Sequence, residues 1–338
     1  MTTFLGRLTK HYSNVHLKLV LLHAPRDNPT TLDFKCACKT FKRNGLVFNP
    51  SLGAIEEVIC YGIASVYTPP ENRGHGFAGH MMSLLHWVLG DEHFLSNHDF
   101  PISKWGEPPV AASGFRNGRF SALWSDVGNC YSKCGPLSST GGGWVVRGTS
   151  TTTWDVRPDS APEAGGLDWV WLDDSGVSKL WQSDTQSIRR SLSTNSRLAF
   201  AFQPSHGVAS YPSRRLSIYT ERLANPPVTW GVASTDCETY TTWSIDPRPP
   251  GPLRLIVTRL RADIRNLGPL VHKLFELALQ HTVTQIEIWG LSLEMEEAAK
   301  KLGAKVQQRV AHLPAFKWYG AESESEITWA FNEHFCWC

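Results

Sequence analysis

The sequence lacks the features that mark secreted, membrane-spanning and disulfide-bonded proteins. It has no Asn-X-Ser/Thr acceptor with X other than Pro. The longest apolar run near the N-terminus, Leu19 to Leu22, is far shorter than a signal-peptide core or a membrane span. Eight cysteines in 338 residues are too few for a disulfide scaffold. We therefore expect a soluble, cytoplasmic protein with reduced thiols and no membrane partner.

Motifs for metal and hydrolase chemistry are missing as well. The close cysteine pairs are Cys36/Cys38, Cys130/Cys134 and Cys336/Cys338. None has the paired C-x2-C spacing of a four-thiolate zinc site, and Glu333-His334 beside the last pair fits no zinc pattern. We expect no bound metal and a docked C-terminal tail. Because G-x-S-x-G and H-E-x-x-H are absent, hydrolase and zinc-protease chemistry have no motif support.

The chain also lacks an excess of charge of one sign. It carries 33 basic and 31 acidic side chains, a formal net charge of +2. No basic stripe or acidic groove is visible, which argues against nucleic-acid or histone-directed activity. Apolar residues make up 41% and charged residues 19%, the balance of a folded chain rather than a disordered one. At roughly 100–200 residues per domain, 338 residues predict about two domains.

Strand-like runs alternate with helical patterns, which predicts an α/β (α+β) fold. Near the N-terminus, residues 16–23 and 31–41 are typical of the two strands of a hairpin. The apolar spacing in FAGHMMSLLHWVL predicts a helix over residues 77–89. The neighbouring elements expected are a strand at 58–68, a loop at 91–118, a strand at 120–127 and a short helix at 128–134.

A stretch rich in Ser, Thr and Gly, residues 138–165, predicts a boundary that divides the chain into residues 1–150 and 151–338. The second part ends in a strand–helix–strand–helix order like that of residues 58–135, which suggests an internal duplication. Its expected elements are strands at 253–260 and 284–291 and helices at about 268–281 and 293–304.

The most informative segment is residues 67–79, YTPPENRGHGFAG. It combines a strand end, a glycine turn and a helix N-terminus, the arrangement that presents backbone N–H groups to phosphate oxygens. The segment therefore predicts a ligand with a pyrophosphate. Gly74, Gly76 and Gly79 also satisfy G-x-G-x-x-G, but no second strand ending in an acidic residue follows at the distance that a dinucleotide fold requires. The alternative interpretation of this segment is a strand-to-helix turn that binds no ligand and has glycines only for tight packing.

Arg73-x-x-Gly76-x-Ala78 matches the acyl-CoA signature [QR]-x-x-G-x-[GA]. Together with blocks in residues 61–86, 121–135 and 316–338, it resembles the fungal lysine N6-acetyltransferase family of the GNAT superfamily. The resemblance implies a GNAT acetyl-CoA-binding domain at 1–150 and a GNAT-like α+β domain at 151–338 that covers the acceptor side. It also implies direct acetyl transfer from acetyl-CoA to a small, lysine-like amine through a ternary complex.

The resemblance assigns roles to residues of the first domain. The residues that would present the loop to the acetyl-CoA pyrophosphate are Arg73, Gly74, His75, Gly76, Phe77 and Ala78. Those that would lie along the pantetheine arm are Ala64, Ser65, Val66 and Tyr67. Asn129 falls where superfamily members contact the cofactor, and Tyr131 falls near the thiol, where it would protonate the leaving thiolate. The alternative for Tyr131 is packing alone.

A general base is harder to assign. Many superfamily members carry a carboxylate on the strand before the signature, and the matching positions here are Gly62 and Ala64. Asp126, at the end of the following strand, is the best substitute, either as a base through water or as an anchor for a cationic substrate. Its alternative role is a helix cap. Glu57 is a poorer candidate, because we expect it to precede the strand.

Two other functions stay open. With an altered pocket, the chain could be an acyltransferase that tailors a fungal specialised metabolite. It could also be a pseudoenzyme or an interaction module, with or without bound CoA. The absent strand carboxylate supports this second alternative. So does the short segment before residue 58, in which the two helices that usually line the acceptor pocket are hard to find.

Overall fold

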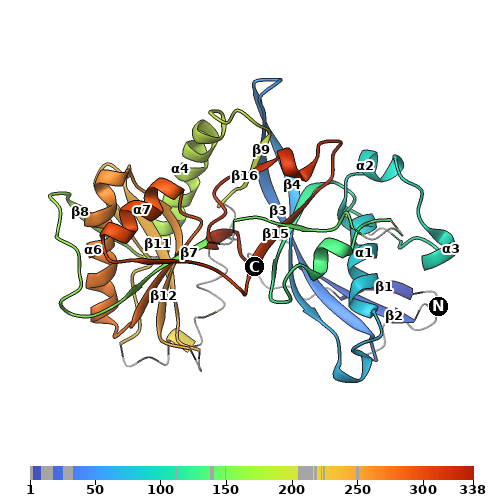
Figure 1. Cartoon of the computed structure of the whole chain (residues 1–338), viewed down its shortest axis with the longest axis horizontal. Helices are drawn as coiled ribbons and strands as arrows, with labels where there is room; N and C mark the ends of the chain where they lie inside the picture. The colour runs from blue at the N-terminus through green and yellow to red at the C-terminus, as the bar shows by residue number, and fades with distance from the viewer. Residues whose placement is uncertain are drawn as a thin grey trace.

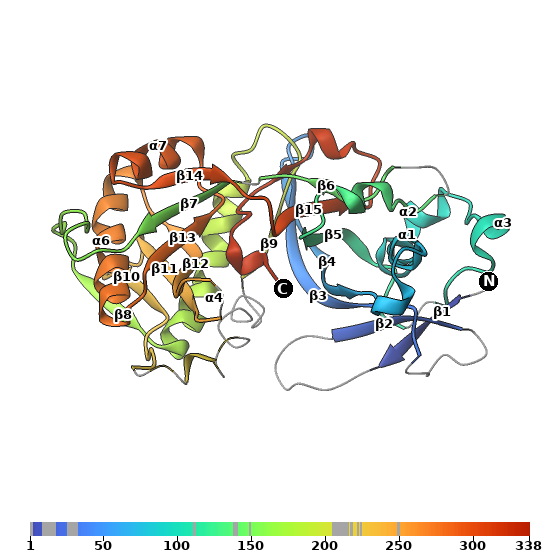
Figure 2. The same ribbon diagram turned by 60° about the horizontal axis from the view of Figure 1, so that its bottom comes forward.

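Two mixed β-sheets organise the chain and lie side by side along its long axis, with helix α4 (Asp174–Leu192) and the C-terminal segment between them (Figures 1 and 2). The computed structural model describes the backbone of residues 3–8 and 18–25. It describes the rest of the chain at 33–110, 113–137, 141–148, 150–204, 216, 219–221, 223, 225–248 and 251–338. None of the helices within these ranges has the length and apolar character needed to cross a membrane.

The first sheet has the order β1-β2-β3-β4-β5-β15-β6, and β9 pairs with β3 and with β16. β4 and β5 are parallel, as are β9 and β16, whereas the other pairs are antiparallel. The strands are β1 Thr3–Leu8, β2 Lys18–Pro25, β3 Cys36–Asn49, β4 Ala54–Tyr67, β5 Gly118–Ser125, β6 Val145–Val146, β9 Ala199–Phe202, β15 Leu313–Trp318 and β16 Thr328–Trp329.

Helix α1 (Phe77–Leu89) makes the crossover from β4 to β5 and packs on one face of this sheet. Its bounds are those that the apolar spacing predicts, because every residue from Met81 to Leu89 is buried. The prediction of an unbroken loop over residues 91–118 is wrong. Two short helices, α2 (Glu92–Ser96) and α3 (Ile102–Trp105), lie there, and the Asp91 side chain caps α2 by accepting a bond from the His93 N–H.

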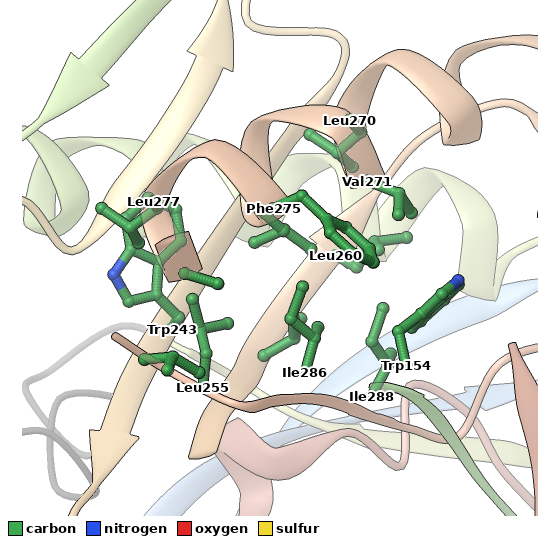
Figure 3. Packing of buried hydrophobic residues seen from close by; sticks show 14 of the residues in the cluster. Trp154, Trp243, Leu255, Leu260, Leu270, Val271, Phe275, Leu277, Ile286 and Ile288 are labelled. Carbon is green, nitrogen blue, oxygen red and sulfur yellow. The ribbon is translucent and has the colours of Figure 1, made fainter. Parts of the chain in front are cut away.

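The second sheet has the order β14-β7-β13-β12-β11-β10-β8, and only β12 and β13 run parallel. Figure 3 shows its core, where Leu270, Val271 and Phe275 of α6 pack toward Ile286 and Ile288 of β13. The elements are β7 Ser150–Asp155, β8 Trp169–Leu172, β10 Gly231–Ser234, β11 Tyr240–Asp246, β12 Arg254–Arg261, α6 Ile264–Gln280, β13 Gln285–Trp289, α7 Leu293–Lys301 and β14 Lys305–Gln308.

The expected strand–helix–strand–helix order of the second part is confirmed, and so is the antiparallel pairing of the two N-terminal strands. The predicted start of α6 at residue 268 is wrong. The helix begins at Ile264 and carries Pro269 in its interior, whereas proline usually marks the first helical position.

Helix α4 has no counterpart among the predicted elements. Asp173 caps its N-terminus by accepting the Gly176 N–H at 2.7 Å, and its buried side chains include Val177, Trp181 and Ile188. The boundary predicted at residue 150 stays a prediction. β7 begins there, but β9, β15 and β16 return to the first sheet.

Candidate functional site

The parallel strands β4 and β5 separate at their carboxyl ends. Their pairing begins at Ile59 with Gly118 and ends at Ile63 with Leu123, although β4 continues to Tyr67. On its other edge, β4 stays paired with β3 through Ala64 and Tyr67, with an irregular register and a positive φ of 52° at Ser65. The predicted arm-binding segment, residues 64–67, therefore lies on β4 where β5 no longer pairs with it.

The loop after β4 ends in an uncapped helix N-terminus. Gly74 and Gly76 have φ of 78° and 79°, a region that residues with a Cβ rarely adopt. No side chain caps α1, and its first backbone bond runs from the His80 N–H to the Gly76 carbonyl at 3.0 Å. The N–H groups of Ala78 and Gly79 precede that bond and so have no acceptor within the helix. They lie at the positive end of the helix dipole, where anionic oxygens are favoured.

Two polar side chains shape the loop. The Nε of Arg73 donates to the Thr68 carbonyl at 3.1 Å, which folds the arginine back toward the end of β4. The ring of His75 contacts the Arg73 carbonyl through Nδ1 at 2.9 Å and stacks on Phe77. Residues 73–76 are exposed, so the loop is accessible to a ligand.

Tyr131 lies on η2 (Cys130–Lys133), a short 3₁₀ turn where a short helix was expected, and packs against the α1 core while half-buried. Burial raises the pKa of its hydroxyl above the ordinary value, and nearby thiols add to the effect. Its carbonyl accepts the N–H groups of Trp144 and Cys134 at 3.1 and 3.2 Å, which fixes the turn. Asn129 precedes the turn and is exposed, and its side chain does not cap it.

Asp126 does not cap the turn either, so the capping interpretation is wrong. Its Oδ1 accepts the backbone N–H of His312 at 2.8 Å and lies 3.0 Å from the His312 Nδ1. Ser125 instead closes the turn at residues 125–128 that precedes η2, by donating to the Gly128 carbonyl and accepting the Val127 N–H. Asp126 thus links the end of β5 to the segment that leads into β15.

The other carboxylate considered, Glu57, lies within β4 and not before it, which corrects the expectation. It is exposed and forms an ion pair with Arg189 of α4. At position 62, a Cβ would lie 2.6 Å from the Sγ of Cys338. Of the two β4 positions where a carboxylate was sought, Gly62 is therefore covered by the C-terminal tail, residues 332–338. Arg43 of β3 holds this tail by donating to the Cys336 and Phe335 carbonyls.

A buried polar network, which sequence reasoning missed, lies behind η2. His86 of α1 contacts the Cys134 carbonyl through Nε2 at 2.8 Å and the Tyr319 hydroxyl through Nδ1 at 3.0 Å. The Ser121 hydroxyl lies 3.0 Å from that of Tyr319 and accepts the Trp144 Nε1–H at 2.9 Å. A histidine within an apolar helical pattern was the only signal in the sequence, because the partners lie far away along the chain.

The donors and acceptors of this network follow from its chemistry. Burial lowers the pKa of His86 to about 3, so the ring is neutral at neutral pH. The Cys134 carbonyl only accepts, so the ring proton is on Nε2 and Nδ1 accepts from Tyr319. The Ser121 hydroxyl then donates to Tyr319. Each member thus has a defined role, and the network holds the carbonyl that ends the Tyr131 turn.

All eight cysteines are free thiols. Within the described ranges, no three His, Cys, Asp or Glu side chains gather in a way that could hold a metal ion. The arrangement is an uncapped helix N-terminus that follows β4 where β4 and β5 separate, with Tyr131 and Asp126 close after the end of β5.

Known proteins share this architecture. Residues 153–338 match the family model described as the LYC1 GNAT-like C-terminal domain. A lysine acetyltransferase of Yarrowia lipolytica (strain CLIB 122 / E 150) is 34% identical over 104 residues, which are 31% of this chain and 25% of that relative. The chain thus matches a quarter of the length of this curated relative.

The chain is also similar to solved structures. A probable N-acyltransferase from Enterococcus faecalis V583 aligns with a TM-score of 0.52 at 11% identity, over 89% of this chain and 62% of that chain. A GCN5-related N-acetyltransferase from Anabaena variabilis ATCC 29413 aligns with a TM-score of 0.47 at 12% identity, over 85% and 63%. The first likeness confirms the predicted fold class. Because the family model covers more than half of the chain, this protein belongs to the LYC1-like family of the GNAT superfamily.

Proposed function

We propose that this chain transfers the acetyl group of acetyl-CoA to the amine of a small molecule, and that the acceptor is a lysine-like ε-amine. The observation that carries the proposal is the uncapped N-terminus of α1, which follows β4 where β4 and β5 separate. Backbone N–H groups at such a terminus suit the oxygens of a pyrophosphate. Acetyl-CoA would supply the activated acetyl group.

Two groups of residues would hold different parts of acetyl-CoA, the pyrophosphate and the pantetheine arm. Those that would hold the pyrophosphate are Arg73, Gly74, His75, Gly76, Phe77 and Ala78. Those that would lie along the pantetheine arm are Ala64, Ser65, Val66 and Tyr67, whose β5-facing edge pairs with no described strand. An N–H of this β4 segment would polarise the thioester carbonyl. Asn129, exposed before η2, would add a polar contact.

Tyr131 would act as the general acid. Its raised pKa keeps the hydroxyl protonated at neutral pH, so it has a proton to give to a departing thiolate. The hydrogen bonds from Trp144 and Cys134 to its carbonyl fix the turn that carries it. A side chain on a fixed turn keeps its orientation between turnovers, which general acid catalysis requires.

Asp126 would accept the proton of the amine through water. A lysine-type amine is neutral in only about one molecule in 2,500 at pH 7, so attack on a thioester needs a proton acceptor. Both contacts from His312 go to Oδ1 of Asp126. Oδ2 makes no hydrogen bond to any residue that the structure describes, and the side chain is exposed, so this oxygen is available to water.

Support for lysine as the acceptor comes from the name of the Yarrowia lipolytica relative. A chain that tailors a specialised metabolite would use the same cofactor cradle with another amine. Acyl-CoA binding without transfer is the second candidate. It is favoured by two observations: Cys338 lies against Gly62, where a strand carboxylate would be, and His312 engages Asp126.

The test is acetyl-CoA-dependent thiol release by the full chain with free lysine, other amino acids, polyamines and aromatic amines, with the product identified by mass. Release with lysine, yielding N6-acetyllysine, would support the proposal. Release with another amine alone would replace the acceptor. Calorimetric binding of acetyl-CoA without release from any amine would favour the non-catalytic candidate. No binding would refute both.

A further inference from the structure

A cavity of about 290 Å³ lies at the carboxyl ends of β12 and β13. Its lining includes Ser187 and Ser191 of α4, the end of β12 (residues 259–262) and the turn after β13 (residues 290–292). Open α/β sheets bind ligands in the crevice outside the carboxyl ends of parallel strands. None of the lining residues belongs to the loop before α1, so this cavity is separate from the proposed acyl-CoA site.

The C-terminal tail occupies the strand opening beside this cavity. β12 and β13 pair only from Arg254 to Ile256 and then separate. Glu333 lies against the end of β12, where its Oε2 accepts the Leu260 N–H at 2.7 Å and its Oε1 accepts Arg259. Arg259 is buried and also forms an ion pair with Asp184, so its positive charge is balanced by the Asp184 and Glu333 carboxylates. The C-terminal tail thus occupies the edge of β12 where β13 no longer pairs with it. The cavity that remains, about 290 Å³, is large enough only for a small ligand.

The side of the cavity formed by α4 and β12 carries positive charge that nearby carboxylates neutralise only in part. The Ser187 Oγ accepts from two guanidinium groups, Arg261 Nη1 at 2.9 Å and Arg190 Nη2 at 3.3 Å. Arg261 also pairs with Glu238, whose side chain is 64% exposed. No carboxylate in the described ranges lies within ion-pair distance of Arg190. Two cations therefore share one neutral acceptor and one solvated anion.

A buried donor faces the same cavity. Ser187 is 8% exposed and lines the cavity, and its own O–H has no acceptor among the residues described. A buried hydroxyl hydrogen without a partner is costly, and an anion at this wall would accept it. Guanidinium groups and a hydroxyl together form charge-assisted bonds to an oxyanion.

The adjoining helix ends and apolar residues narrow the ligand class. α6 follows β12 directly, and no side chain caps its N-terminus, whereas α7 is capped by Ser292 and carries Glu294 in its first turn. The first N–H groups of α6 therefore lack a side-chain acceptor, and the carboxylate of Asp263 at its N-cap is paired with Arg265. Leu291, Met295 and Phe331 complete the lining with apolar surface.

We infer that this cavity binds a small organic oxyanion, a molecule that joins a phosphate or carboxylate group to a compact apolar part. Arg261 and the Ser187 hydroxyl hold the anionic group, and Arg190 adds charge from α4. The inference does not depend on the proposed acetyl transfer, because it uses no residue of the acyl-CoA loop.

The test uses the full chain saturated with acetyl-CoA, titrated by calorimetry with inorganic phosphate and, separately, with glutarate. At least one probe is expected to bind, and the probe that binds more tightly identifies the anionic group. Arg261→Gln combined with Arg190→Gln should weaken binding at least tenfold, and Arg261→Lys, which keeps the charge, should weaken it less. Lys300→Gln, which removes a surface charge on α7, is the matched control.

Three results would overturn the inference. The first is that neither probe binds. The second is that the double variant binds as tightly as the wild type while its thermal unfolding is unchanged. The third is that Lys300→Gln weakens binding as much as the double variant does. The same titration without acetyl-CoA reports whether phosphate also binds the loop before α1. If acetyl-CoA abolishes all phosphate and glutarate binding, the anion site is that loop and the inference is wrong.

Discussion

The Nδ1 of His86 on α1 and the hydroxyl of Tyr319 lie 3.0 Å apart, although 233 residues separate them in the sequence. His86 also contacts the Cys134 carbonyl, and Tyr319 lies directly after β15, the strand that returns from the far end of the chain. Two buried hydrogen bonds through His86 therefore join the C-terminal part of the chain to the turn that carries Tyr131.

Removing the bond between His86 and Tyr319 should destabilise the fold. Tyr319→Phe leaves the Nδ1 of His86 and the Ser121 hydroxyl without their partner in a buried site, at a cost of about 1–3 kcal/mol in the free energy of unfolding. Urea unfolding at neutral pH measures it. The matched control is Tyr67→Phe, which removes the hydroxyl of a half-exposed tyrosine and should change stability by less than about 0.5 kcal/mol. Equal effects of the two variants would contradict the role of the network.

The buried imidazoles should make the protein sensitive to acid. Burial lowers the pKa of His86 and of His334 to about 3. Between the unfolded value near 6.5 and about 3, the unfolded chain binds the proton and the native chain does not, so stability falls as the pH falls. Each histidine contributes a slope of about 1.4 kcal/mol per pH unit in that range.

His86→Gln isolates one of these contributions, because a glutamine amide can donate to Cys134 and accept from Tyr319 without titrating. Urea unfolding at several pH values from 7 to 5 should show a stability curve shallower than that of the wild type by about 1.4 kcal/mol per pH unit below pH 6. Parallel curves for the variant and the wild type would show that His86 does not titrate as its burial implies.

The general-acid role predicts a separation of turnover from binding. Tyr131→Phe should lower kcat at least tenfold, since positioned proton transfer contributes about 10²–10⁴-fold. The calorimetric affinity for acetyl-CoA should stay within about twofold, because the turn is held by the Tyr131 backbone carbonyl and not by its hydroxyl. Unchanged turnover would refute this assignment, and a loss of both turnover and binding would indicate a structural role.

Asp126 offers a test that separates catalysis from tethering. Asp126→Asn keeps an oxygen that can accept the His312 N–H but removes the negative charge. If Asp126 is the base, kcat should fall at least tenfold, and KM for acetyl-CoA should not change. Asp126→Ala removes the tether as well and should also lower stability. If the Asn variant retains full turnover while the Ala variant is destabilised, the carboxylate only anchors the segment before β15.

The sequence predicted most where local patterns decide the structure. The apolar repeat of residues 77–89 gives the bounds of α1, and Gly74 and Gly76 before it adopt the positive φ of the predicted glycine turn. Residues 174–192 were missed although Val177, Leu180, Trp181, Ile188 and Leu192 are buried along one helix. That stripe is regularly spaced, but the serines, aspartates and threonines between its members keep the mean hydropathy of the segment low.

Long-range pairing explains the rest. Nothing local indicates that β15 pairs with β5, that Cys338 packs against Gly62 or that His312 binds Asp126. Each of these contacts joins the C-terminal part of the chain to the first sheet. They decide which carboxylates near the site are free, so the choice of a base could not be made from spacing alone.

The measurement that tests the central claim most directly is a calorimetric titration of acetyl-CoA into the wild type, Gly76→Ala and Gly53→Ala. Both glycines have positive φ, and a Cβ built on either lies more than 4 Å from every described residue other than the chain neighbours, so alanine strains both backbones alike. Only Gly76 belongs to the proposed cradle. We predict saturable binding by the wild type and by Gly53→Ala, and at least tenfold weaker binding by Gly76→Ala. Equal affinity in all three proteins, or no binding by the wild type, would contradict the assignment of the loop to acyl-CoA.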